Sequence, residues 1–272
     1  MDILIDTIKD TILIIPILFV MYLCLEYFEH RQTNQRVEYY LTHYGPLLGA
    51  VLGIIPQCGF GVLASLLFIE GKMTLGSLIS VFIATSDEAI PILLTNPEMY
   101  TSLIGIIFIK FIFAIIVGYA VDFLFKNQSF EHFHTHIEHT HEHSIIIEAL
   151  FRTFKIYAFI FAVNFVLSLA IETIGSTTLS YLLLDRSMVQ PIVAAIFGFI
   201  PNCAASVILT QLYISQALSF ASLVAGLITN AGLGLLVLLQ NKIDMHIFIR
   251  ICMILLLSAL LLTLPIQWFY LH

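Results

Sequence analysis

One segment of this chain occurs twice, and the two copies align without a gap. Residues 46–90 and 191–235 are related by a constant offset of 145 positions. Identical residues are spread evenly over the segment, and they include Pro46 and Pro191, Gly53 and Gly198, Pro56 and Pro201, Cys58 and Cys203, Ser77 and Ser222, and Ile83 and Ile228. The chain therefore has two related halves, and any fold must place each copy in a comparable environment.

Both copies interrupt an apolar run at matching places. The first interruption is a Pro-polar-Cys tripeptide, Pro56–Cys58 in one half and Pro201–Cys203 in the other. The second is a short polar stretch, Thr85–Asp87 in one half and Thr229–Ala231 in the other. Duplicated halves with interrupted hydrophobic segments at corresponding positions are typical of secondary transporters, and the interruptions mark the binding site.

The composition places these halves in a membrane. Apolar residues make up 60% of the chain and charged residues 11%, whereas soluble domains carry roughly one quarter charged residues. The sequence has no basic patch of the kind that binds nucleic acid. Apolar runs near the spanning length of about 20 residues lie at 11–28, 46–69, 74–96, 102–125, 154–174, 191–213, 217–239 and 247–269.

The loop charges favour a particular topology. If all eight runs cross the membrane, Lys and Arg divide evenly between the two sides. If 46–69 and 191–213 instead enter and return as hairpins, turning at Pro56–Gly59 and Pro201–Ala204, eight basic residues share one face against two on the other. The positive-inside rule then makes the eight-charge face cytoplasmic. The alternative is that Pro56 and Pro201 merely kink two spanning helices.

The predicted fold is an all-α integral membrane protein with an inverted-topology repeat. Each half has three spanning helices and one re-entrant hairpin, so the molecule has six spans and four half-spans. We expect a first repeat at 1–125, a cytoplasmic linker at 126–153 and an inverted second repeat at 154–272. The protein would lie in the plasma or inner membrane with both termini outside.

Several strings in these halves resemble a known family. They are Gly53–Ser65 (GIIPQCGFGVLAS), Phe82–Pro91 (FIATSDEAIP), Gly198–Cys203 (GFIPNC) and Gly226–Gly232 (GLITNAG). Together they resemble the ten-helix heavy-metal exporters, a family related by name to the ArsP permeases. The resemblance covers nearly the whole chain. Because members are described as arsenic efflux proteins or manganese transporters, it implies export of a metal or metalloid.

Two adjacent acids lie in the middle of an apolar segment. Placing Asp87 or Glu88 there costs about 2.5 kcal/mol or more even on insertion scales, so a function is expected. We assign Asp87 to the transported ion and Glu88 to a second ligand or a proton carrier. Lys110 is the basic residue deepest in a predicted span, and it is a charge partner for these acids. A Glu88–Lys110 pair that only holds helices together is the structural alternative.

The remaining candidate ligands surround the interruptions. Amide, thiol and hydroxyl groups there are Gln57, Cys58, Asn202, Cys203, Thr85, Ser86, Thr229 and Asn230. Carboxylate and other oxygen ligands suit Mn²⁺, whereas two thiols favour Zn²⁺, Cd²⁺ or an arsenic(III) species. This set favours a divalent cation, with Mn²⁺ first. Either cysteine could also be a small packing residue at a crowded turn.

The predicted linker is rich in histidine. Six imidazoles lie within thirteen residues, at His132, His134, His136, His139, His141 and His143. Neutral imidazole binds transition metals, but a tract without fixed spacing suits a loose collector rather than a rigid site. An ordinary polar linker is the alternative reading. A collector on the cytoplasmic side fits export better than uptake.

These features predict a secondary active exporter rather than an enzyme. The sequence has no phosphate-binding loop of the Gly-x-x-x-x-Gly-Lys-Ser/Thr type, so an ion gradient of H⁺ or Na⁺, or a partner subunit, must supply the energy. We expect no permanently bound cofactor. Lipid and a small inorganic ion are the expected partners, and a homodimer is one of the oligomeric states that the sequence allows. The alternatives are a sodium- or proton-coupled oxyanion carrier and, less favoured, an intramembrane enzyme.

Overall fold

The computed structural model describes two stretches of the chain in detail. These are residues 44–125 without Gln57 and Asp87, and residues 187–271 without Lys242. A few single residues, between Pro16 and Phe19 and between Leu150 and Ala162, are described as well. All regular elements in the described part are helices, as the sequence predicts. The domain boundaries at 125/126 and 153/154 border on or lie in the part that is not described.

Each described stretch contains a similar series of helices. The first holds α4 (Gly45–Ile54), α5 (Cys58–Ile69), α6 (Leu75–Ala84), α7 (Ala89–Leu94), the short 3-10 helix η1 (Pro97–Met99) and α8 (Tyr100–Leu124). The second holds α11 (Gln190–Gly198), α12 (Cys203–Ile214), α13 (Phe220–Thr229), α14 (Leu233–Gln240) and α15 (Met245–Leu271).

The bounds of these helices follow the offset seen in the sequence. Helices α5 and α12 begin 145 residues apart and end 145 residues apart, and the same holds for α6 and α13. Helices α8 and α15 also begin 145 residues apart. The offset therefore extends beyond the segment in which identical residues are frequent.

Four helical stretches in the described residues are long and apolar enough to cross a membrane. They are Leu75–Leu94, Pro97–Leu124, Phe220–Gln240 and Met245–Phe269, and they agree with the predicted runs at 74–96, 102–125, 217–239 and 247–269. The protein is a multi-pass membrane protein. The predicted runs 11–28 and 154–174 fall almost wholly outside the described residues.

Two of these four stretches are broken near their middle. Helix α6 ends at Ala84 and α7 begins at Ala89, while α13 ends at Thr229 and α14 begins at Leu233. In the second break Gly232 has a φ of 55°, a left-handed conformation that glycine adopts without steric cost. Pro56 and Pro201 follow α4 and α11 closely, because proline cannot donate the backbone hydrogen bond that would continue a helix. The helix breaks lie at the interruptions predicted from the sequence.

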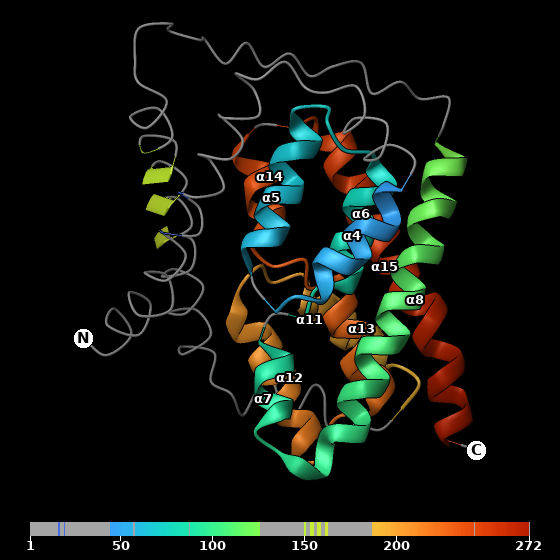
Figure 1. The fold of residues 1–272 in the computed structure, drawn as a ribbon. Coiled ribbons are helices and arrows are strands. Elements are labelled where there is room, and N and C mark those ends of the chain that lie inside the picture. The colour runs from blue at the N-terminus through green and yellow to red at the C-terminus, as the bar shows by residue number, and fades with distance from the viewer. Residues whose placement is uncertain are drawn as a thin grey trace, which may run out of the picture.

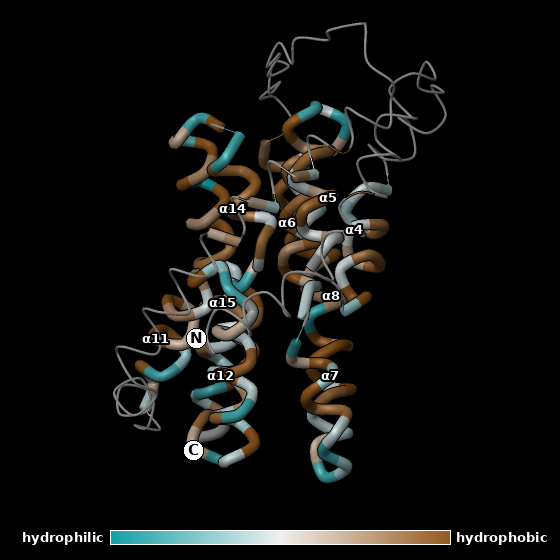
Figure 2. Tube along the Cα trace, turned by 90° about the vertical axis from the view of Figure 1, so that its left-hand side faces the viewer, coloured by the Kyte–Doolittle hydropathy of each residue, from teal (hydrophilic) through white to brown (hydrophobic). Residues whose placement is uncertain are grey.

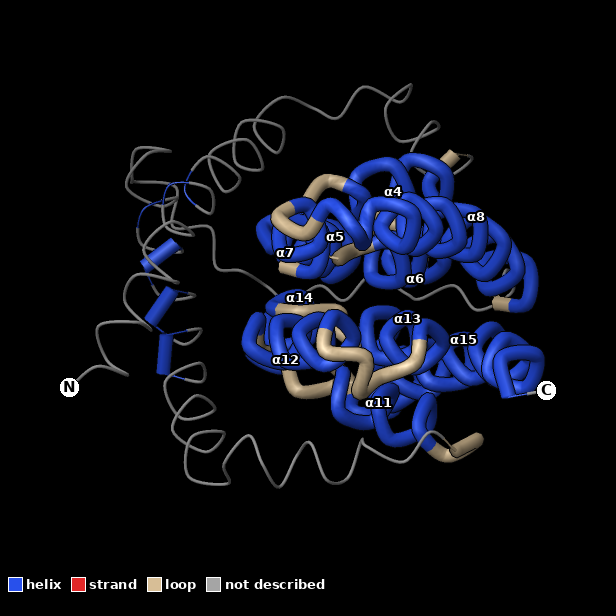
Figure 3. Tube along the Cα trace, turned by 90° about the horizontal axis from the view of Figure 1, so that it is seen from below, coloured by secondary structure: helices blue, strands red, loops and turns tan. Residues whose placement is uncertain are grey.

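The two stretches form two layers that pack side by side. Figure 3, seen along the bundle, places α4 to α8 in one layer and α11 to α15 in the other. Within a layer, α4 packs on α6 and α8, and α11 packs on α13 and α15. Between layers, α5 packs on α14 and α12 packs on α7. As a result α4, α5 and α14 lie toward one end of the bundle, and α7 and α12 toward the other (Figure 1).

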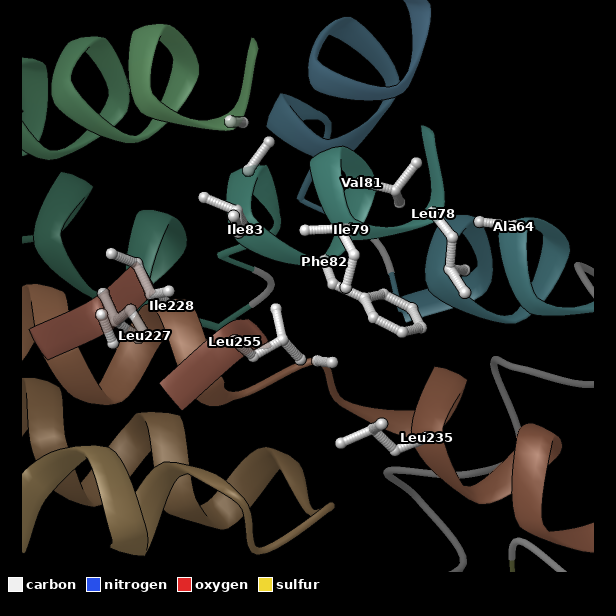
Figure 4. Close-up of a cluster of buried hydrophobic side chains, with 14 of the residues drawn as sticks. Ala64, Leu78, Ile79, Val81, Phe82, Ile83, Leu227, Ile228, Leu235 and Leu255 are labelled. Carbon is white, nitrogen blue, oxygen red and sulfur yellow. The ribbon is translucent and has the colours of Figure 1, made fainter. Parts of the chain in front are cut away.

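The interior between the layers is apolar. Figure 4 shows Phe82 and Ile79 of α6 facing Leu255 of α15, with Leu227 and Ile228 of α13 nearby, and all five side chains are buried. Figure 2 shows hydrophobic residues along most of each helix and hydrophilic ones both at the ends of the bundle and midway along it. The outer face of α8 exposes large apolar side chains, which suits contact with lipid: Ile104, Phe108, Ile112, Ile116 and Phe123.

Candidate ion-binding site at the helix breaks

The breaks bring polar groups into the middle of the bundle. Figure 1 shows that α6 gives way to α7, and α13 to α14, midway along the length of the bundle. Thr85 and Ser86 in one break and Thr229 and Asn230 in the other are buried. Non-helical backbone at membrane depth is tolerated only where protein or a cavity surrounds it. The breaks therefore form a protein-enclosed polar centre.

Lys110 of α8 projects its ammonium into this centre. The side chain is 1% exposed. Its Nζ donates to the backbone oxygen of Thr85, to Ser86 Oγ at 2.6 Å and to the backbone oxygen of Leu227 at 2.9 Å. The first two acceptors belong to the break after α6, and the third belongs to α13. One ammonium thus contacts both layers.

Two of the acceptors of Lys110, the backbone oxygens of Thr85 and Leu227, are carbonyls at the helix breaks. In a continuous α-helix the oxygen of Leu227 would accept from the N–H of Ala231. The N–H of Ala231 instead donates to the oxygen of Thr229 at 2.9 Å, because the helix ends there. The last carbonyls of a helix carry partial negative charge. The buried ammonium therefore neutralises the carboxyl-terminal ends of two half-helices.

Glu88 does not pair with Lys110 in the part of the chain that the structure describes. The ion pair found among the described residues is a different one: Lys72 Nζ lies 2.9 Å from Glu70 Oε2 in the turn after α5. Glu88 is the residue before α7, its side chain makes no capping bond, and it is partly exposed. The structural alternative considered for these two residues is thus not what the structure shows.

The side-chain amide of Asn202 has one bonded end and one unpartnered donor. Its Oδ1 accepts from the N–H of Ala204 at 3.1 Å and so caps α12. The side chain is 5% exposed, and its Nδ2 is buried without a hydrogen-bond partner. The sequence predicts an amide oxygen for the cargo here; this oxygen accepts the capping bond and keeps a second lone pair. What Asn202 offers at the amino-terminal end of α12 is an N–H group.

Thr229 and Asn230 stabilise the second break. Thr229 Oγ1 donates to the oxygen of Ala195 at 2.7 Å, which ties α13 to α11. Asn230 Oδ1 accepts from the N–H of Gly232 at 3.2 Å and holds the turn that leads into α14. Both groups thus have structural roles, and the hydroxyl oxygen of Thr229 keeps lone pairs that can accept further bonds.

Other predicted site residues lie outside the described residues or only partly within them. Gln57, Asp87 and the histidine tract at 131–143 are not described. Cys58 and Cys203 are placed by their backbone as the first residues of α5 and α12. Among the described side chains no group of three or more His, Cys, Asp and Glu gathers to hold a metal ion.

Sequence reasoning missed a pair of capping networks far from the breaks. Asp122 at the end of α8 accepts from Thr74 Oγ1 at 2.8 Å and from the N–H of Gly76 at 2.7 Å, at the start of α6. At the positions 145 residues later, Gln267 accepts from Ser219 Oγ at 2.7 Å, at the start of α13. The offset itself was the signal that could have found them, because it pairs Thr74 with Ser219 and Asp122 with Gln267.

Fold and site together define a class: a multi-pass helical membrane protein whose long helices break around a buried polar centre. The family described as "Putative, 10TM heavy-metal exporter" matches residues 1–175 and 141–267. These two overlapping matches cover nearly the whole chain, and the chain belongs to this family. The resemblance seen in its motifs is confirmed. Neither the curated proteins nor the solved structures contain a match.

Proposed function

We propose that this protein is a secondary active transporter that exports a heavy-metal ion by alternating access of two inverted repeats. The family supports metal export. The observation that carries the mechanism is that both broken helices, α6–α7 and α13–α14, open at one buried polar centre. Discontinuous helices of this kind form the substrate and coupling-ion sites of many secondary transporters.

The inverted repeat has support from the helix pairs. The packing of α4 on α6 and α8 has a counterpart in the packing of α11 on α13 and α15. The contact of α5 with α14 has a counterpart in the contact of α12 with α7. The placement of α5 toward one end of the bundle and of α12 toward the other (Figure 1) supports an inversion rather than a simple translation.

Re-entrant hairpins have support from helix length and placement. Helix α4 has 10 residues and α5 has 12, which corresponds to about 15 and 18 Å against a hydrocarbon core of about 30 Å. The two helices contact each other and lie toward the same end of the bundle (Figure 1). In this proposal α4–α5 and α11–α12 are the hairpins, with their turns beside the polar centre.

The distribution of basic residues supports an orientation. Lys72 lies in the turn between α5 and α6, and the Arg250 guanidinium lies 5.2 Å from the ring centre of Phe125. Phe125 precedes the 126–153 linker. The corresponding loops at the other end, 95–99 and 215–219, contain no Lys or Arg. By the positive-inside rule the linker end is cytoplasmic, and both termini are outside.

For the cargo we favour a divalent cation, Mn²⁺ first. Asp87 supplies the principal carboxylate, Glu88 is a second ligand or a proton carrier, and the thiols Cys58 and Cys203 would widen the choice to softer ions. The histidine tract at 131–143 would collect metal on the cytoplasmic side. Coupling is to H⁺ or Na⁺, and the alternating access needs no permanently bound cofactor.

An oxyanion is the second candidate, and Asn202 favours it. Its unpartnered Nδ2 needs an oxygen acceptor, and it lies at the amino-terminal end of α12, where the helix dipole attracts negative charge. An oxyanion or a hydroxylated metalloid would supply such an oxygen. A metal-bound water would do so too, so a hydrated cation also fits this donor.

The proposal is tested by metal flux in proteoliposomes with Asp87→Asn. We expect loss of transport, because the amide preserves the volume but removes the charge that a divalent ion needs in a low-dielectric site. Glu98→Gln, an exposed acid between α7 and α8, is the matched control and should transport normally. Near-normal flux of every metal in the folded Asp87→Asn variant would overturn the carboxylate mechanism and promote the oxyanion candidate.

Replacing the two cysteines distinguishes a hard metal cargo from a thiophilic one. If Mn²⁺ is the cargo, Cys58→Ser and Cys203→Ser should reduce its flux only modestly, because oxygen ligands already satisfy it. A thiophilic cargo should lose transport in either variant. The same vesicles, offered arsenite, Zn²⁺ and Mn²⁺ in turn, separate these outcomes.

A further inference from the structure

We propose that the ammonium of Lys110 is a built-in cation that occupies the place of a coupling Na⁺ ion. The inference rests on the proposed transport function only in that it assigns the coupling ion. The binding place itself is a property of the fold. The proposal predicts that Na⁺ changes neither the stability nor the metal flux of the native protein, and that shortening Lys110 creates a Na⁺ site.

The geometry around Nζ is that of a cation site. An ammonium has three N–H donors and no acceptor, and the oxygens that it contacts include Thr85 O, Ser86 Oγ and Leu227 O. Two are backbone carbonyls and one is a hydroxyl. Unwound backbone carbonyls and the carboxyl-terminal ends of half-helices are the groups that coordinate Na⁺ in secondary transporters. The same groups here surround a tethered charge.

The position of the ammonium has an electrostatic reason. Helix α6 ends at Ala84 and α13 ends at Thr229, so the negative ends of two half-helix dipoles meet inside the protein. These helices contact each other, and without a cation their terminal carbonyls would be buried near one another. Among the residues that the structure describes, Lys110 is the one charged residue that is buried, and it supplies that cation.

Only the first repeat carries this cation. The position 145 residues after Lys110 is Leu255, which is fully buried and faces the apolar side chains of Phe82 and Ile79 (Figure 4). One ammonium therefore serves the ends of both α6 and α13. It also links the layers, since α8 and the break after α6 belong to one and Leu227 belongs to the other.

The test is thermal unfolding of the full chain in detergent, in NaCl and in N-methyl-D-glucamine chloride of equal ionic strength. The wild type should unfold at the same temperature in both salts. Lys110→Ala should unfold at a lower temperature in N-methyl-D-glucamine, because the helix ends lose their cation. NaCl should raise that temperature by about 3 °C or more, since Na⁺ binds the folded state.

Leu255→Ala is the matched control, because it removes a buried side chain of similar size from the equivalent position. It should be destabilised equally in both salts. Absence of a Na⁺-specific rise in Lys110→Ala, or an equal rise in Leu255→Ala, would overturn the proposal.

A measurement on the wild type keeps the inference testable if Lys110→Ala does not fold. Replacing Na⁺ by N-methyl-D-glucamine on both sides of the proteoliposome should leave metal flux unchanged, and a NaCl titration should leave the unfolding temperature unchanged. A Na⁺-dependent rise in either quantity would show that Na⁺ binds beside Lys110 or elsewhere and would overturn the inference. Absence of any metal flux, with Na⁺-insensitive unfolding, would instead count against the transport function alone.

Discussion

Single polar residues in this protein act mainly on the ends of helices. Thr74 caps α6 by accepting from the N–H of Ser77 at 3.1 Å, and Asp122 of α8 binds both Thr74 and the next free N–H, of Gly76. The first N–H groups of a helix have no partner within it. Thr74 and Asp122 supply partners for these groups, and Asp122 joins the start of α6 to the end of α8.

These bonds predict that Asp122 contributes to stability. Asp122→Ala should lower the free energy of unfolding by about 1–2 kcal/mol, because the N–H of Gly76 and the hydroxyl of Thr74 lose their acceptor. Asp122→Asn keeps an oxygen for one of them and should lose less. Thermal unfolding of the purified protein in detergent measures both, and equal losses in the two variants would contradict this role.

Pairs of half-helices form the contacts between the two layers. Gly61 of α5 and Gly234 of α14 allow these helices to approach closely, and Ser65 Oγ lies 2.9 Å from the backbone oxygens of both. Small residues at helix interfaces are typical of membrane proteins, where close packing drives association. In this contact the backbone of one layer rests directly on the other.

The two glycines of this contact differ in the space around them. A Cβ at Gly234 would lie 2.6 Å from Phe82 Cε1 and 2.8 Å from the oxygen of Gly61, whereas one at Gly61 would have its nearest neighbour, the oxygen of Ala231, at 3.5 Å. Gly234→Ala should therefore separate α5 from α14 and lower stability by about 1–3 kcal/mol. Gly61→Ala is the matched control and should be tolerated.

Thermal unfolding and metal flux together check this prediction. We expect Gly234→Ala to lose both melting temperature and flux, since α5 begins at Cys58, a proposed ligand. The idea would be wrong if Gly61→Ala were the more damaging of the two.

At the scale of the whole molecule, the proposed inverted arrangement predicts which loops share a side of the membrane. Single cysteines in place of Lys72 and Ser144 should react with an impermeant thiol reagent only from the cytoplasmic side. Cysteines in place of Glu98 and Arg186 should react only from outside. Labelling in right-side-out and inverted vesicles measures this, after subtraction of the native cysteines in the unsubstituted protein. Reaction of Lys72→Cys and Ser144→Cys from opposite sides would exclude the re-entrant hairpins.

The sequence by itself determined the helical fold, the location in a membrane and the breaks. Hydrophobic run length and the positions of Pro56 and Pro201 depend only on local chemistry, so α4 to α6 and α11 to α13 could be placed from them. The offset of 145 and the family motifs likewise reside in the order of residues. The paired acids at 87 and 88 could be singled out because a charge in an apolar run is costly wherever the chain folds.

Only the tertiary structure decided what the polar groups contact. Lys110 is separated from Leu227 by 117 residues, and no local pattern indicates that its ammonium binds helix-end carbonyls rather than Glu88. The unpartnered donor of Asn202 depends on which end of its amide caps α12. Such choices follow from which buried donors and acceptors are left unpaired after the helices pack, and that is a property of the assembled bundle.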